Sequence, residues 1–120
     1  MTDKSALYKT AREVFEEATT PVLGLTVYKV LCFHLEQRIG KDPYEVLLED
    51  PKKFYEEFEK LFAKGTDVLL NYVGKCLEDK YCTNFSPEKF VELLYKGDES
   101  SKNKMIEIMT MIHEKKKRVF

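Results

Sequence analysis

The stretch that decides the fold is residues 22–35, VLGLTVYKVLCFHL, the longest apolar run in a chain of 120 residues. Lys29 and His34 interrupt it, so it falls short of the roughly 18 apolar residues that a membrane-spanning helix requires. It predicts a helix over about residues 21–39 that is apolar on most sides. Because a helix that is apolar all round is buried all round, we expect it either at the centre of a bundle or against another chain.

If this helix meets another chain, the residues that would face it are Val22, Leu25, Tyr28 and Phe33. Large exposed apolar patches mark interfaces, and symmetric dimers are the commonest oligomers. We therefore take Tyr28 and Phe33, with the region of Tyr81 and Phe85, as candidate contact residues. For the fold itself we predict the central position, because small helical domains often contain one such helix.

Prolines and glycines divide the chain into helices. Each proline follows a residue that commonly caps a helix N-terminus; the four pairs are Thr20-Pro21, Asp42-Pro43, Asp50-Pro51 and Ser86-Pro87. Gly40, Gly65 and Gly97 follow segments of helical periodicity and are predicted to end helices. No segment alternates with the period of a strand.

This pattern predicts an all-α fold, a compact multi-helix bundle of about six or seven helices around a central apolar helix, in a single domain over residues 1–120. The helices are expected at about residues 3–19, 21–39, 43–48, 51–64, 66–82, 87–96 and 101–116. The polar segment 96–104 is expected to be a loop.

No motif in the sequence indicates catalysis or metal binding. Cys32, Cys76 and Cys82 have irregular spacing, which fits neither a disulfide framework nor a zinc site. His34 and His113 stand outside any HExxH motif, and neither a GxSxG motif nor a phosphate-binding glycine loop is present. We therefore predict no catalytic residue, no metal site and no cofactor, and we expect a non-enzymatic role.

The composition indicates a cytoplasmic location and argues against nucleic acid as a partner. The formal net charge is -1 and the pI is about 6.2, whereas domains that bind nucleic acid commonly have a pI above about 9. Residues 1–20 lack the continuous apolar core of a secretory signal. With three cysteines that form no framework, we expect a cytoplasmic protein with no membrane association and with a protein partner or self-association.

Two alternative functions stay open at this point. The segment 66–96 could form a helix-turn-helix of a DNA-associated regulator, with the basic residues Lys115, Lys116, Lys117 and Arg118 contacting phosphate. Alternatively, an apolar pocket between aromatic-rich helices could sense a small apolar ligand.

The middle of the chain also resembles a known family. The residues that carry the resemblance are Gly40, Asp50-Pro51, Phe54, Phe58, Leu61-Phe62, Lys64-Gly65, Val68-Leu69-Leu70 and Leu77. Over about residues 5–82 the chain resembles the archaeal Nitrosopumilus output domain, and the residues after Cys82 depart from that pattern. The resemblance implies a small helical module that acts with signalling components and has no catalytic residues. The leading hypothesis is thus a regulatory or protein-interaction domain that forms a dimer.

Overall fold

Three helices begin at a proline whose preceding side chain caps the helix. In a computed structural model, which describes residues 3–118, the side chains of Asp42, Asp50 and Ser86 accept hydrogen bonds from backbone N–H groups two or three residues further on. The distances are 3.0, 3.3 and 3.1 Å. These bonds satisfy N–H groups that have no partner inside the helix. The three predicted helix starts are confirmed.

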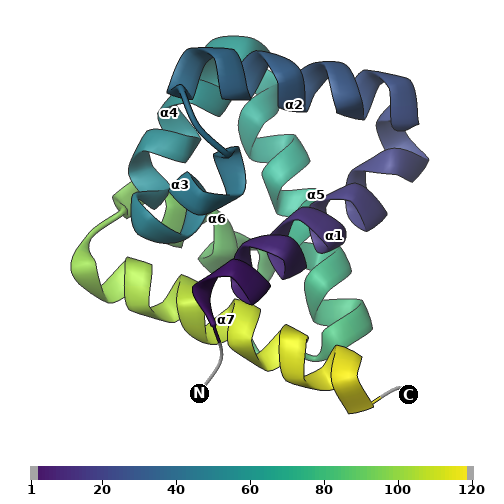
Figure 1. The fold of residues 1–120 in the computed structure, drawn as a ribbon, viewed down its shortest axis with the longest axis vertical. Coiled ribbons are helices and arrows are strands. Elements are labelled where there is room, and N and C mark those ends of the chain that lie inside the picture. Colours follow the sequence, from purple (N-terminus) through teal and green to yellow (C-terminus); the bar gives the residue numbers. More distant parts are fainter. Residues whose placement is uncertain (1–2, 119–120) are drawn as a thin grey trace.

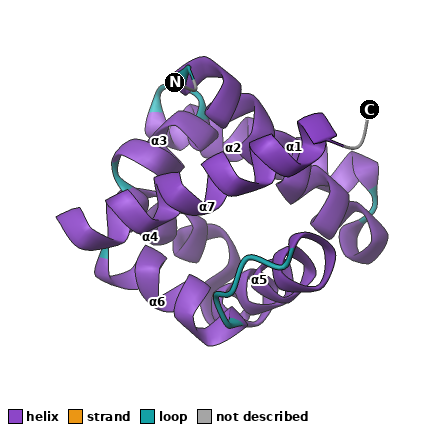
Figure 2. Cartoon of the chain, turned by 90° about the horizontal axis from the view of Figure 1, so that it is seen from below, coloured by secondary structure: helices purple, strands orange, loops and turns teal. Residues whose placement is uncertain are grey.

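The described part of the chain folds into seven α-helices and one 3-10 turn, and it contains no strand (Figures 1 and 2). The elements are α1 (Lys4–Leu23), α2 (Leu25–Ile39), α3 (Pro43–Glu49), α4 (Pro51–Phe62), η1 (Ala63–Gly65), α5 (Thr66–Tyr81), α6 (Pro87–Lys96) and α7 (Glu99–Arg118). The all-α class and the number of helices are confirmed. Between residues 3 and 118, no helix is both long enough and apolar enough to cross a membrane.

The break between the first two helices lies at Gly24 and not at Thr20-Pro21, so the predicted start at Pro21 is wrong. Pro21 lies inside α1, in its last turn, where the φ angle fixed by the ring suits a helix, although the missing N–H removes one helical bond and the ring crowds the carbonyl four residues earlier. Gly24 has φ 87° and ψ 152°, which no α-helix accommodates. The chain therefore turns at the glycine.

The apolar second helix lies at the edge of the bundle, whereas α1 buries one face against four neighbouring helices. α1 packs against α2, α3, α5 and α7, and Ala11 and Ala18 on its buried face let the neighbouring helices approach closely. α2 buries only Tyr28, Leu31 and Leu35, and it lies along the upper edge of the molecule (Figure 1). The prediction of a central apolar helix is therefore wrong.

The core is organised around an aromatic cluster that joins α1, α3, α4 and α6. The ring of Phe15 lies 5.5 Å from that of Tyr44, 5.8 Å from that of Phe54 and 6.4 Å from that of Phe90. All four side chains are buried. Aromatic pairs at these separations add to the stability that comes from their burial.

Two further boundaries differ from the prediction. Gly65 lies within the 3-10 turn η1, and α4 ends at Phe62, followed by Ala63, which takes the positive φ of 48° instead. The expected loop 96–104 is short, because Asp98 accepts a hydrogen bond from the N–H of Ser101 at 2.8 Å and α7 begins at Glu99. Gly97 ends α6 as predicted.

Candidate interaction surface

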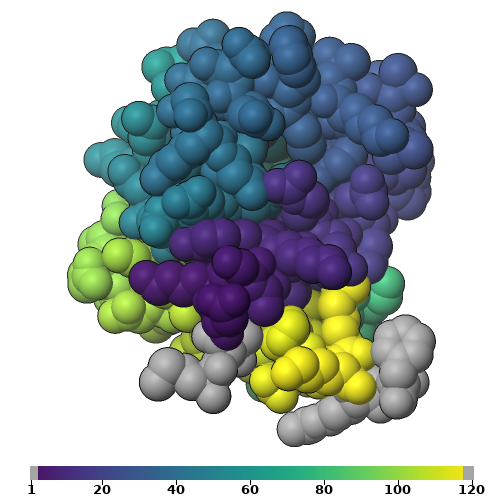
Figure 3. All heavy atoms as spheres, in the orientation of Figure 1, coloured from purple at the N-terminus to yellow at the C-terminus, as the bar shows by residue number. Residues whose placement is uncertain are grey.

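The solvent side of α2 carries several exposed large apolar side chains among polar ones. Val27 and Val30 are each 50% exposed and Phe33 is 59% exposed. Of the eight large apolar side chains that are exposed between residues 3 and 118, five lie within residues 22–33. Such residues are usually scattered singly on a surface, so this concentration identifies a candidate interaction surface, which we call the α2 face. In the space-filling view α2 forms the upper margin of the molecule (Figure 3).

The α2 face has the residue spacing of a coiled-coil seam. Thr26, Val30, Phe33 and Gln37 follow one another at intervals of four, three and four residues, and all four are exposed. In coiled coils, residues at these intervals pack into a facing helix. The two apolar members stand in the middle of the row and the two polar members at its ends.

A hydrogen-bonded group beneath α2 fixes the helix to the rest of the molecule. The hydroxyl of Tyr28 lies 2.6 Å from the hydroxyl of Tyr44 on α3, and Cys32 Sγ lies 3.5 Å from the same Tyr44 oxygen. The Tyr28 hydroxyl also donates to the backbone carbonyl of Arg12 on α1 at 3.4 Å. Burial raises the pKa of Tyr44 well above its usual value and also raises that of Tyr28. Both hydroxyls therefore stay protonated and hydrogen-bonded.

The C-terminal end of α2 is fixed as well. Gly40 takes φ 87° and ψ 4°, and its N–H donates to the carbonyl of Glu36, which closes the helix. Arg38 Nε donates to a carboxylate oxygen of Glu57 on α4 at 2.9 Å. The apolar side chains thus project from a helix that is held at both ends, which presents them as a preformed surface.

Two opposite charges flank the seam on the same side. Lys29 and Glu36 are seven residues apart, which places them at equivalent positions beside the row of Thr26, Val30, Phe33 and Gln37. Both side chains are exposed, and neither forms an ion pair or a side-chain hydrogen bond with any residue from 3 to 118. The surface therefore offers one unpaired cation and one unpaired anion.

The four contact residues predicted from the sequence do not form one surface. Phe33 is exposed as predicted, but Tyr28 is 4% exposed and belongs to the core. Tyr81 is buried, and its hydroxyl donates to Glu17 at 2.9 Å. Phe85 is half-buried and packs against the core. The prediction is thus wrong for Tyr28 and Tyr81, whose hydroxyl groups find partners inside the fold.

The structure does not gather the basic residues of the C-terminal segment into a free cluster. Lys115 donates to the backbone carbonyls of Tyr81 and Cys82, and Lys116 pairs with Glu17 at 2.8 Å. Lys117 is exposed, and the side chain of Arg118 lies outside the described residues. Two of the four residues proposed to contact phosphate therefore hold α7 against α1 and α5.

The α5–α6 segment proposed as a helix-turn-helix presents a mixed surface. Phe90, Leu93 and Leu94 of α6 are buried, and the other side of the helix carries a chain of charges in which Glu92 pairs with Lys89 at 3.5 Å and Lys96 at 2.9 Å. Glu88 in the first turn is acidic. This arrangement lacks the excess of cations that attracts a phosphate backbone.

The sequence pointed to Val22, Leu25 and Phe33 but missed Val27 and Val30. No signal in the sequence marks Val27 and Val30 as exposed, because residues 22–35 are apolar on most sides of the helix. Among residues 3–118, no group of three or more His, Cys, Asp or Glu side chains is placed to hold a metal ion.

No family model, no curated protein and no solved structure matches the chain.

Proposed function

We propose that this chain is a non-catalytic helical interaction domain that self-associates through the α2 face. The observation that supports the proposal most strongly is the coiled-coil seam, exposed on a helix that its buried residues hold in place. The regulatory role that the resemblance to the output-domain family implies belongs to the same proposal. So does a cytoplasmic location, which the three free cysteines favour.

The partner that fits the α2 face is a second copy of the chain in antiparallel orientation. A twofold axis midway between Val30 and Phe33 places Val30 against the partner subunit's Phe33. The same axis places Thr26 against the partner subunit's Gln37. Apolar pairs then occupy the middle of the contact and polar pairs its rim, which is the usual arrangement in interfaces.

The charges beside the seam favour the antiparallel orientation over the parallel one. In an antiparallel pair the flank that carries Lys29 and Glu36 faces itself, so Lys29 lies beside Glu36 of the partner subunit. The twofold axis repeats this contact, which gives two ion pairs. In a parallel pair Lys29 would instead lie beside His34 of the partner subunit, which offers no opposite charge.

The size of the α2 face sets the expected strength of the dimer. Val30 and Phe33 in the seam, with Leu25 and Val27 on its two flanks, together expose on the order of 400 Å², which lies within the range of the largest patches on monomers. α2 has 15 residues, so the contact is about 22 Å long. An interface of this size lies at the low end for specific complexes, and we expect a Kd in the range of about 10–100 µM.

A charge exchange tests both the surface and the orientation. Lys29→Glu places two glutamates side by side at each end of the contact and should weaken the dimer about tenfold, because two attractions become two repulsions. Adding Glu36→Lys reverses both charges and should restore dimerisation. The dimer Kd of each variant is measured by sedimentation velocity, with Lys64→Glu, which changes an exposed lysine of η1, as the control.

The possible results distinguish the choice of the α2 face as the interface from the antiparallel orientation of the two copies. Loss of the dimer in Lys29→Glu and its return in the double variant support the antiparallel pairing. An unchanged Kd in Lys29→Glu would exclude this pairing, and a dimer equally weakened by Lys64→Glu would exclude the α2 face.

A further inference from the structure

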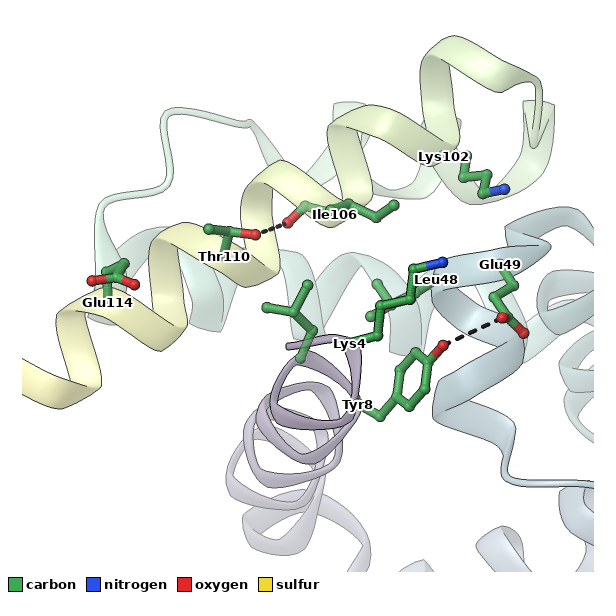
Figure 4. Close-up of a pocket in the computed structure, with 9 residues that line it drawn as sticks. Lys4, Tyr8, Leu48, Glu49, Lys102, Ile106, Thr110 and Glu114 are labelled. Atoms are coloured by element: carbon green, nitrogen blue, oxygen red, sulfur yellow. Dashed lines mark hydrogen bonds between the residues drawn. The ribbon is translucent and has the colours of Figure 1, made fainter. Parts of the chain in front are cut away.

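A pocket lies between α1, α3 and α7, and none of its lining residues belongs to α2 (Figure 4). Its volume is about 530 Å³, within the range of pockets that hold small molecules. The apolar part of its wall comes from Leu7 on α1, Leu48 on α3 and Ile106 on α7. Leu7 and Leu48 are buried and Ile106 is half-buried.

The pocket is elongated along α7. This helix lines it with Lys102, Ile106, Thr110 and Glu114, which follow one another every four residues on one side of the helix. At 1.5 Å per residue, the row is about 18 Å long. The Thr110 hydroxyl donates to the carbonyl of Ile106 at 2.8 Å, so it is already used within the helix. The middle of the wall therefore suits an extended apolar chain better than a compact polar ligand.

Positive charge collects at one end of this row. The amino groups of Lys4 and Lys102 lie on the side of the pocket where Glu49 is found, and Glu114 lies at the other end (Figure 4). Within the described range 3–118, neither amino group forms an ion pair or a hydrogen bond, although Lys4 is close enough to Glu49 to lower the pKa of its carboxylate.

The carboxylate of Glu49 is already engaged at this end of the pocket. It accepts hydrogen bonds from Lys41 at 3.2 Å and from the hydroxyl of Tyr8 at 3.3 Å. Lys41 also pairs with Glu45 at 3.7 Å. Among the charged residues that line the pocket, Lys4 and Lys102 share this end with Glu49, and Glu114 lies at the other end.

We infer that the pocket between α1, α3 and α7 binds a linear amphiphile with one anionic head, of the fatty-acid class. The carboxylate lies between Lys4 and Lys102, and the alkyl chain covers Leu7, Leu48 and Ile106. The ligand would thereby contact three helices at once. This inference does not rest on the proposed self-association through α2.

Binding is tested on the full chain with octanoate as the probe, by ¹³C-methyl NMR titration. The methyl signals of Leu7, Leu48 and Ile106 should shift with a 1:1 stoichiometry, and those of Leu25 on the α2 face should stay in place. Hexanoate should bind about tenfold more weakly than octanoate, and decanoate about tenfold more tightly. Each step changes the chain by two CH₂ groups, and burying each CH₂ contributes about 0.8 kcal/mol to binding.

The role of the two lysines is tested by charge removal. Lys4→Gln with Lys102→Gln should weaken octanoate binding about fivefold to tenfold and leave the binding of 1-octanol unchanged. The matched control is Lys64→Gln with Lys75→Gln, which removes two exposed lysines that do not line the pocket, and it should change neither affinity. All four lysines are exposed or at the pocket rim, so the variants are expected to fold.

Three results would overturn the inference. Methyl signals that do not move with octanoate would exclude binding, and shifts confined to the α2 face would place the amphiphile elsewhere. Equal affinity for octanoate, 1-octanol and octylamine would exclude recognition of an anionic head by the lysines.

Discussion

Glu17 on α1 connects three helices, and its replacement by glutamine gives a prediction with a defined magnitude. Its carboxylate accepts hydrogen bonds from Lys80 at 2.8 Å, from the Tyr81 hydroxyl at 2.9 Å and from Lys116 at 2.8 Å. Partial burial alone would raise the pKa of Glu17. The bonds from Lys116, Lys80 and Tyr81 outweigh burial and lower the pKa from 4.5 to about 2.

The shift in pKa sets the stabilisation that the carboxylate provides. A change from 4.5 to about 2 corresponds to at most about 3 kcal/mol. Because 36% of the side chain is exposed, solvent screening reduces this contribution, and we expect Glu17→Gln to cost about 1–2 kcal/mol at pH 7. Since the pKa is lowered on folding, the contribution is complete above pH 4.5 and is lost as the pH falls towards about 2.

Urea unfolding of the wild type and of Glu17→Gln at pH 7 and at about pH 3 measures this effect. The free-energy difference should be about 1–2 kcal/mol at pH 7 and clearly smaller at pH 3. Glu16→Gln, which changes the neighbouring exposed glutamate, should have little effect at either pH. A Glu17 variant whose cost does not depend on pH, or does not exceed that of Glu16→Gln, would refute the reasoning.

Two further predictions concern the packing of the helices. Gly97→Ala should cost about 3 kcal/mol or more, because the new Cβ would lie 2.3 Å from Cβ of Lys52 at a φ of 56°. Gly40→Ala should cost only about 1 kcal/mol, because φ is 87° there but no atom lies within 4 Å of the new Cβ. If thermal unfolding shows the same loss of stability for Gly97→Ala and Gly40→Ala, the close contact between Gly97 and Lys52 is contradicted. Tyr28→Glu should cost about 3 kcal/mol or more because it buries a charge, whereas Phe33→Glu on the exposed side of α2 should change the free energy of unfolding by less than about 0.5 kcal/mol. If urea unfolding shows a larger loss of stability for Phe33→Glu than for Tyr28→Glu, then α2 buries the side that carries Phe33 and not the side that carries Tyr28.

The sequence predicted the helices well where a local motif defines a helix end. Asp42, Asp50 and Ser86 before prolines, and Gly40 and Gly97 after helical segments, were all placed correctly. Such caps involve only neighbouring residues, so their chemistry is visible in the chain itself. Thr20-Pro21 failed because a proline is also tolerated near the end of a helix that a later glycine terminates.

The sequence could not show which side of the second helix is buried. Residues 22–35 are apolar on most sides, so periodicity does not distinguish the core side from the solvent side. The choice depends on the contact between the hydroxyls of Tyr28 and Tyr44, which lie 16 residues apart in the chain. A contact of this kind appears only when the helices are packed, and for the same reason the position of the second helix at the edge of the bundle was not predicted.

The α2 face and the α1–α3–α7 pocket also differ in how far the sequence revealed them. The residues of the α2 face are adjacent in the sequence, but the buried residues Tyr28, Leu31 and Leu35 have a similar spacing, so the structure is needed to show which side is exposed. The pocket combines Lys4 with Lys102, which no sequence pattern connects. Its discovery therefore requires the three-dimensional arrangement of the helices.

The most direct test of the account is the solution mass of the wild type as a function of concentration. Light scattering coupled to size exclusion, with samples from about 10 µM to about 1 mM, should show a mass that rises from 14.1 kDa towards twice that value. Phe33→Glu should remain at 14.1 kDa throughout while keeping its helical circular dichroism. A wild-type mass of 14.1 kDa at every concentration, or a Phe33→Glu variant that dimerises as well as the wild type, would contradict self-association through the α2 face.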